Sequence, residues 1–199
     1  HAATTPGAGD PPGLRLEDCA TQRNLSEAGR RQARRLGEAF RSRGVRVARV
    51  LSSPWCRCLE SAELAFGARP ATHPALGNLY GRAGNRERQA AAFRALIAEA
   101  PAGGNLVLVT HGSTTLALTG EYPAMGEAIV ITPAGGGGFR VAGRIAPSGF
   151  IIGAVWGSKR ASSTWGTKRT TRAKRCSPRR SRAPRAEWRS STWRGATCA

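Results

Sequence analysis

A continuous apolar run and a short β segment, each ending at a polar turn, most restrict the folds open to this chain. Leu106–Val109 is continuously apolar and ends just before His111, and Val45–Leu51 ends shortly before Arg57. Uninterrupted apolar strands are typical of parallel sheets that helices cover on both faces. Ligands bind such sheets outside the carboxyl ends of the strands. A parallel sheet therefore predicts that Arg57 and His111 share one edge.

Helical patterns separate these runs. Ser26 is the expected N-cap of a helix that ends at Gly44. Pro54 suits the first turn of a second helix, Trp55–Phe66, and a third is predicted from about Asn85 to Ala100. Arginines surround the apolar face of the first helix. We expect them to form a solvated surface rather than a nucleic-acid contact.

The remaining pattern completes an α/β order. A further helix is predicted from Ser113 to Leu118, followed by strands at 129–131 and 139–145 joined through glycines. Helices that alternate with buried strands predict a three-layer α/β fold, with a mainly parallel sheet flanked by helices.

Charge divides the chain into two regimes. The formal net charge is +19, and residues after 150 hold every Lys of the chain but only one acid, Glu187. We therefore expect a domain over 1–146 and a basic tail over 147–199. The tail either binds nucleic acid by neutralising phosphates, or it is non-native, frame-shifted sequence, which we favour because its composition changes abruptly.

Hydropathy and cysteine spacing exclude some classes. No apolar run approaches the roughly 20 residues that cross a bilayer, so we expect no membrane span. Cys56 and Cys58 point to different sides of their helix, which suits neither a CxxC redox pair nor a zinc site. Cys19 either pairs with one of them in an oxidising compartment, or all three are buried thiols.

Four motifs occur in order along the chain. They are His1–Thr4, Asn24–Ala33, Leu51–Arg57 with Glu60-Ser61-Ala62, and Val109–Gly112. Together they resemble the histidine phosphatase superfamily, the phosphoglycerate-mutase-like fold, over roughly residues 1–146. Two details, Asp18–Asn24 and Trp55–Cys58, are similar to a bacterial branch whose members usually carry an export leader. The resemblance thus implies a periplasmic or secreted full-length protein, although this chain shows no leader.

The resemblance implies roles for single residues. His1 matches the nucleophile that forms a phosphohistidine, and Arg57 and His111 match the groups that hold the transferring phosphoryl group. Thr4, Gly112 and Arg23 are candidate phosphate-binding residues. No metal and no cofactor is implied, and the third histidine, His73, is expected to be an exposed bystander.

The chain departs from the family pattern at its start. The Arg that should precede His1 and the whole first strand are absent, and Ala2 replaces the usual Gly. We therefore expect a chain truncated at its N-terminus, with strands next to the gap unpaired, impaired folding and low activity.

The expected function is hydrolysis of phosphomonoesters or phosphohistidine through an intermediate on His1. Protonating a poor leaving group usually needs a carboxylic acid, and Glu87, Glu99 and Glu121 are poor candidates by position. Good leaving groups are therefore favoured, on small phosphorylated substrates or phosphohistidine proteins. The alternatives are a basic nucleic-acid-binding protein, in which only the tail contacts nucleic acid, and a catalytically inactive relative kept for interaction.

Overall fold

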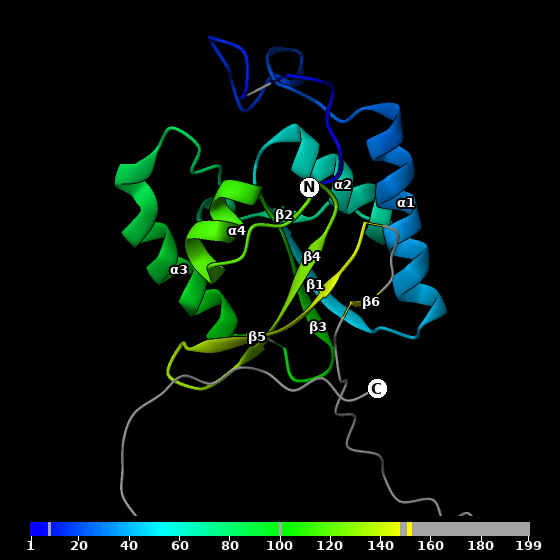
Figure 1. Cartoon of the computed structure of the whole chain (residues 1–199), viewed down its shortest axis with the longest axis vertical. Helices are drawn as coiled ribbons and strands as arrows, with labels where there is room; N and C mark the ends of the chain where they lie inside the picture. Colours follow the sequence, from blue (N-terminus) through cyan, green and yellow to red (C-terminus); the bar gives the residue numbers. More distant parts are fainter. Residues whose placement is uncertain (8, 100, 148–150, 153–199) are drawn as a thin grey trace, which may run out of the picture. The chain divides into compact units, whose positions relative to one another are not determined.

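The computed structural model describes residues 1–7, 9–99, 101–147 and 151–152 (Figure 1). The chain forms two units, His1–Gly157 and Ser158–Ala199. The second unit lies outside the described residues, as does the tail expected over 147–199 apart from residues 147, 151 and 152. The fold and the candidate site belong to the first unit.

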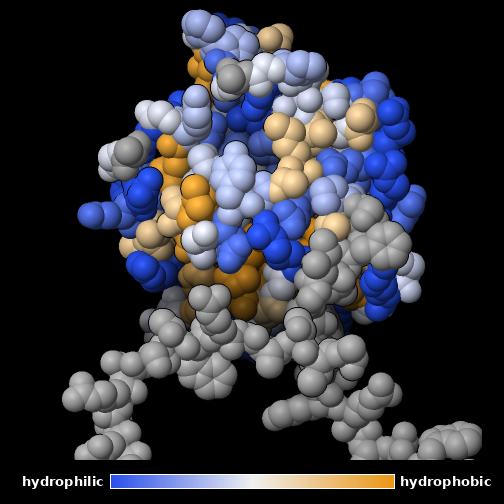
Figure 2. Space-filling view, viewed as in Figure 1, coloured by the Kyte–Doolittle hydropathy of each residue, from blue (hydrophilic) through white to orange (hydrophobic). Residues whose placement is uncertain are grey.

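The first long helix follows the predicted signals. α1 (Glu27–Ser42) begins after Ser26, whose hydroxyl accepts a hydrogen bond from the backbone N–H of Gly29. Ala33 and Gly37 are buried on its inner face. Its outer face is hydrophilic, and in Figure 2 such side chains gather on the α1 side of the molecule. Exposed arginines there are Arg31, Arg34, Arg35 and Arg41.

Three parallel strands form the first sheet, in the order β2-β1-β3. β1 is Val47–Ser52, β2 is Ala71–Thr72 and β3 is Asn105–Val109. The register pairs Leu51 of β1 with Leu108 of β3, so that the two strands end side by side. The sequence predicted this pairing of carboxyl ends, but it did not predict β2.

The other helices connect or cover these strands. α2 (Cys56–Phe66) follows β1, α3 (Arg86–Ala98) precedes β3, and α4 (Gly112–Thr119) follows β3. Short 3-10 helices occur at Cys19–Thr21 (η1), Pro74–Leu76 (η2) and Ala83–Asn85 (η3). η2 and η3 lie between α2 and α3.

A second, antiparallel sheet has the order β4-β5-β6. β4 is Ala128–Pro133, β5 is Phe139–Ile145 and β6 is Ile151–Ile152. β4 and β5 are antiparallel because a short glycine-rich turn joins them, and Gly135, Gly136 and Gly137 all have positive φ there. β6 pairs with β5 beyond residue 146.

Helices cover the strands on both sides. Figure 1 shows α1 and α2 on one side and α3 and α4 on the other. The main core lies under α3, where Phe93, Leu96 and Ile97 pack with Leu51 and Leu76. The chain thus has the expected layered α/β architecture, with a parallel sheet between helices.

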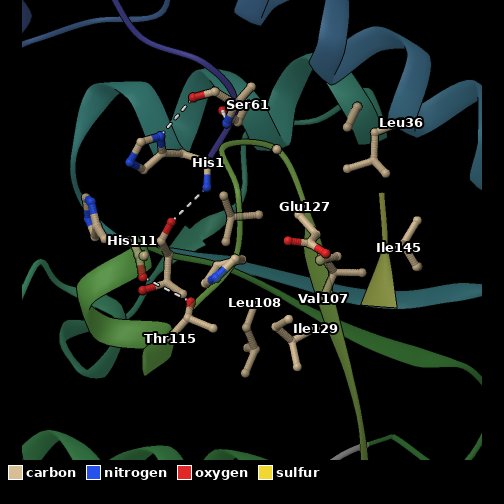
Figure 3. A pocket seen from close by; sticks show the side chains of 18 of the residues that line it. His1, Leu36, Ser61, Val107, Leu108, His111, Thr115, Glu127, Ile129 and Ile145 are labelled. Atoms are coloured by element: carbon tan, nitrogen blue, oxygen red, sulfur yellow. Dashed lines mark hydrogen bonds between the residues drawn. The ribbon is translucent and has the colours of Figure 1, made fainter. Parts of the chain in front are cut away.

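A cavity of about 780 Å³ is lined by residues of both sheets. Figure 3 shows Val107 and Leu108 of β3 and Ile129 of β4 around it. Among the described strands, β3 pairs only with β1, and β4 only with β5. Each of them therefore has one edge without a strand partner in the described part of the chain.

Candidate active site

Arg57 lies in the first turn of α2, directly after the turn that ends β1. Only 1% of the residue is exposed, although it carries a permanent charge. Burial of an unpaired guanidinium is costly, so its partners define what this site is built to hold. One of them is a backbone carbonyl, that of Arg23, which accepts from Nη1 at 3.2 Å.

His111 is the N-cap residue of α4 and follows the end of β3. The residue is 3% exposed. Nη2 of Arg57 lies 3.4 Å from its Nδ1. Because a guanidinium only donates, Nδ1 is the acceptor, and Nε2 is left to donate to Ser53 Oγ at 2.8 Å. Burial first, and then the charge of Arg57, hold the pKa of His111 well below its ordinary value, so the imidazole is neutral.

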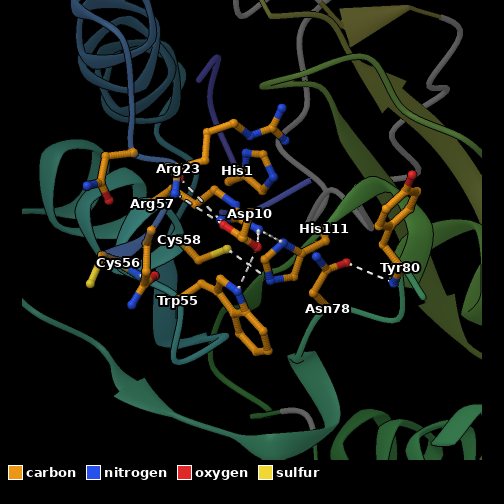
Figure 4. A network of polar contacts seen from close by, with 12 residues as sticks. His1, Asp10, Arg23, Trp55, Cys56, Arg57, Cys58, Asn78, Tyr80 and His111 are labelled. Atoms are coloured by element: carbon orange, nitrogen blue, oxygen red, sulfur yellow. Dashed lines mark hydrogen bonds and ion pairs between the residues drawn. The ribbon is translucent and has the colours of Figure 1, made fainter. Parts of the chain in front are cut away.

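His1 lies beside His111, with 5.2 Å between the ring centroids (Figure 4). Its Nδ1 is 2.9 Å from the carbonyl oxygen of Ala2. A carbonyl only accepts, so Nδ1 carries a proton in this hydrogen bond, and the neutral form of the ring then has its free lone pair on Nε2. His1 is therefore in the tautomer that can act as a nucleophile through Nε2.

Backbone hydrogen bonds to several elements fix the His1 segment. The backbone nitrogen of His1 donates to the carbonyl of Thr110 at 2.8 Å, and Gly126 donates to the carbonyl of His1 at 2.9 Å. The backbone N–H of Ala2 donates to Ser61 Oγ of α2 at 3.0 Å. The segment is therefore tied to the turn after β3, to α2 and to the loop before β4.

Asp10 is the residue of this site that sequence reasoning missed. Its carboxylate accepts from both terminal nitrogens of Arg57, with Nη2 at 3.1 Å. It also accepts from Trp55 Nε1 at 3.2 Å and from the backbone N–H of Arg23 at 3.2 Å. Burial raises the pKa of Asp10, but the hydrogen bonds and the charge of Arg57, together with the hydrogen bonds from Arg23 and Trp55, outweigh burial and lower the pKa. Asp10 lies in a loop without periodic pattern, so only its charge could have drawn attention to it.

The other predicted phosphate-binding residues are placed differently. Arg23 and Gly112 line the same cavity as His1, Arg57 and His111. Figure 4 shows the Arg23 side chain beside His1, and this side chain donates to the carbonyl of Gly7. Thr4 is buried at 9% exposure and is not among the residues that line the cavity.

The acids considered from the sequence lie elsewhere or are already paired. Glu87 is in the first turn of α3 and Glu99 is its C-cap. Glu121 pairs with Arg144 at 2.9 Å. Glu127 does line the cavity, but the same arginine lowers its pKa. Of these carboxylates and Asp10, only that of Asp10 contacts Arg57.

His73 lies away from this group. It is the N-cap of η2, where Nδ1 accepts from the backbone N–H of Ala75 at 3.2 Å. It is half-buried rather than fully exposed, and His73 does not line the cavity. Within the described part of the chain, no group of three or more His, Cys, Asp or Glu could hold a metal ion.

The cysteines adopt one of the arrangements left open by the sequence. Cys19 and Cys56 form a disulfide, with 5.7 Å between their Cα atoms. Cys58 is a buried free thiol whose sulfur lies 3.6 Å from His111 Nε2. The disulfide attaches the loop after Asp10 to the residue next to Arg57. The two helix cysteines thus face different environments, as their spacing predicted.

Residues 18–80 match the model of the histidine phosphatase superfamily (branch 1). The matched stretch contains η1, α1, β1, the whole of α2, β2 and η2, and therefore Arg57 in its structural setting. Over this stretch the chain is similar to the histidine phosphatase superfamily. The match supports a phosphatase, a member of the hydrolases, and favours this function over nucleic-acid binding.

A solved histidine phosphatase shares this fold. The structure of the protein histidine phosphatase SixA complexed with tungstate is similar, with a TM-score of 0.54 and 20% identity over 74% of this chain and 93% of that one. A mycobacterial glucosyl-3-phosphoglycerate phosphatase matches with a TM-score of 0.41 and 21% identity over 59% of this chain and 74% of that one. No curated protein matches the sequence. None of the described helices is long and apolar enough to cross a membrane.

Proposed function

We propose that this phosphatase hydrolyses phosphate monoesters or phosphohistidine through a covalent phosphohistidine on His1. The observation that carries the proposal is the convergence of one guanidinium and two imidazoles on a single cavity, with Arg57 and His111 just past the carboxyl ends of β1 and β3. An imidazole with a free Nε2, next to a buried arginine, provides a nucleophile and an anion-binding group together.

Arg57 is the group best suited to bind the substrate. Its two terminal nitrogens already hold a planar anion, the carboxylate of Asp10. A phosphoryl group presents oxygens with a similar bidentate geometry. Since the transferring group carries its charge on three equatorial oxygens, catalysis depends largely on positioning and on electrostatic stabilisation.

His111 changes its role when an anion binds. It is neutral in the described structure because it is buried beside Arg57. A phosphoryl dianion would add opposite charge next to the imidazole, and a nearby opposite charge favours the protonated form. Protonated His111 would donate to an oxygen of the phosphoryl group. Nε2 of His1 then attacks phosphorus in line with the leaving group, and water hydrolyses the phosphohistidine.

The leaving group receives little help from this site. Asp10 is ionised, because Arg57 lowers its pKa, and Glu127 is ionised for a similar reason. Neither carboxyl group holds a proton at neutral pH. We therefore expect substrates whose leaving groups need no proton donor, such as acyl phosphates, aryl phosphates or phosphohistidine. SixA is named as a protein histidine phosphatase. The disulfide suits a periplasmic or secreted protein.

Labelling by a phosphoryl donor tests the proposal. Protein incubated with radiolabelled acetyl phosphate and quenched in alkali should carry an acid-labile label, which peptide mass spectrometry places on His1. Arg57→Ala should abolish the label, and His111→Ala should reduce it strongly. His73→Ala is the matched control, because this histidine lies outside the cavity. A folded protein that hydrolyses aryl phosphates without any label on His1 would contradict the proposal.

A further inference from the structure

The Asp10 carboxylate occupies the donors that would bind a phosphoryl group. It holds both terminal nitrogens of Arg57, as well as Trp55 Nε1 and the backbone N–H of Arg23 (Figure 4). The side chains of Arg57 and Asp10 are 2% and 12% exposed. No phosphoryl group can bind Arg57 through both terminal nitrogens while this ion pair is in place.

Asp10 is a buried charge carried by an exposed loop. Its neighbours Pro11, Pro12 and Gly13 are exposed. Apart from the contacts of Asp10, the described hydrogen bonds from the stretch 6–13 to the rest of the chain include only that from Arg23 to Gly7. Few contacts other than those of its carboxylate therefore hold this stretch over the site, and local opening of such a segment costs little.

We propose that Asp10 is a specificity-determining residue. Phosphoryl dianions displace its carboxylate from Arg57, whereas monoanions do not. The proposal rests on the phosphatase function inferred above and adds a rule for which substrates enter. Phosphate monoesters at neutral pH are dianions, whereas phosphodiesters are monoanions.

The selectivity follows from the tether. A group attached by a short flexible segment acts at an effective concentration of about the millimolar range. A free monoanion makes similar contacts with the same donors, so it has to compete with the tethered Asp10 carboxylate, which is always present. A dianion has twice the charge facing the buried guanidinium, and charges interact more strongly in such a site than in water. Only the dianion therefore gains enough to exchange with Asp10.

A different role for Asp10 predicts the opposite result. If its carboxylate only orients the guanidinium, its removal leaves Arg57 less well ordered, and anions then bind more weakly. If Asp10 competes with the substrate, its removal makes anions bind more tightly. The sign of the change in affinity therefore separates the two roles without any measurement of turnover.

Calorimetric titration with inorganic phosphate at pH 7.5 measures this sign. Asp10→Asn keeps the size of the side chain and removes its charge. When the competing state is about 90–99% populated, its loss tightens binding by about 10- to 100-fold. Asp18→Asn is the matched control, because Asp18 also pairs with an arginine, Arg15, but on the surface. We expect this control to bind phosphate with unchanged affinity.

A second titrant tests the selectivity. Dimethyl phosphate, a monoanion, should bind the wild-type protein far more weakly than phosphate does. In Asp10→Asn the difference between the affinities for the two anions should be smaller. Asp10→Ala repeats both titrations should the Asn variant fail to fold, as judged by thermal unfolding. The proposal is overturned if the folded variants bind phosphate with unchanged or weaker affinity, or if the difference in affinity between phosphate and dimethyl phosphate does not change.

The titration also separates this inference from the proposed function. Binding of phosphate requires the arginine site but no covalent step on His1. Tighter binding in Asp10→Asn together with absent labelling of His1 would support the inference and refute the phosphohistidine route. Labelling of His1 in a variant that binds phosphate no more tightly would support the phosphohistidine route and refute the inference about Asp10.

Discussion

Removing the disulfide between Cys19 and Cys56 should destabilise the protein by about 4 kcal/mol. The bond joins the loop that contains η1 to the first residue of α2. Cys56 also donates its backbone N–H to Gln22 Oε1 at 2.9 Å, so the loop and the helix start are held by two contacts. The perturbation is the double variant Cys19→Ala, Cys56→Ala.

The magnitude follows from the length of the closed loop. The two cysteines are 37 residues apart. In the chain-entropy description, closing a loop of that length removes roughly 13 cal/mol/K from the unfolded ensemble, or about 3.8 kcal/mol at room temperature.

Urea unfolding of the double variant and of the oxidised protein provides the assay. A loss of about 4 kcal/mol lowers the midpoint by about 2 M, and a more expanded unfolded chain raises the slope. Reductant should lower the midpoint of the wild-type protein by a similar amount. The double variant keeps Cys58 and is the control, since reductant should leave its midpoint unchanged.

The same variant reports on the site. Because Arg57 follows Cys56 directly, a loosened helix start orders the guanidinium less well, and phosphate should bind more weakly. A midpoint that moves by less than about 0.3 M would refute the reasoning, because it would mean that the cross-link does not restrict the unfolded chain. A large shift with unchanged phosphate affinity would refute only the link to Arg57.

Three further predictions concern single residues. In Gly29→Ala a Cβ would overlap the carbonyl oxygen of Ala3. This clash outweighs the gain of about 1 kcal/mol in helix propensity, so the thermal midpoint should fall. Gly84→Ala, with open space around it, is the control. The pKa of His111 is lower in the folded protein than its ordinary 6.5, so the unfolded state binds more protons and stability should fall as pH drops below about 6.5; urea midpoints of His111→Gln should change less over this window. Burial raises the pKa of the Cys58 thiol, so this thiol should react with a thiol reagent at pH 8 only after urea unfolding.

The sequence predicted the parts of the fold that depend on periodicity and caps. α1 follows its cap Ser26, and β3 follows its apolar run. Because parallel strands end at one edge of a sheet, the same reasoning predicted that Arg57 and His111 lie together. These features depend on patterns of neighbouring residues and on one topological rule, which is why they can be predicted from a single sequence.

Asp10 and the cysteine pairing could not be predicted, because both depend on where a loop lies. The side chain of Asp10 meets Arg57 across 47 residues of sequence, through a segment of Pro and Gly without a periodic pattern. The spacing of Cys56 and Cys58 indicated that they point to different sides of α2. It could not indicate which side faces Cys19, since that depends on the path of the η1 loop.

Ser61 connects the proposed nucleophile to the proposed phosphate-binding group. It lies one turn after Arg57 on α2, and its hydroxyl donates to the carbonyl of Arg57 at 2.7 Å. The same oxygen accepts from the backbone N–H of Ala2 at 3.0 Å. A movement of α2 therefore carries both His1 and Arg57 with it, which limits the change in distance between the attacking nitrogen and the bound phosphorus. In-line transfer depends on that distance, so one buried serine on a helix helps to preserve it.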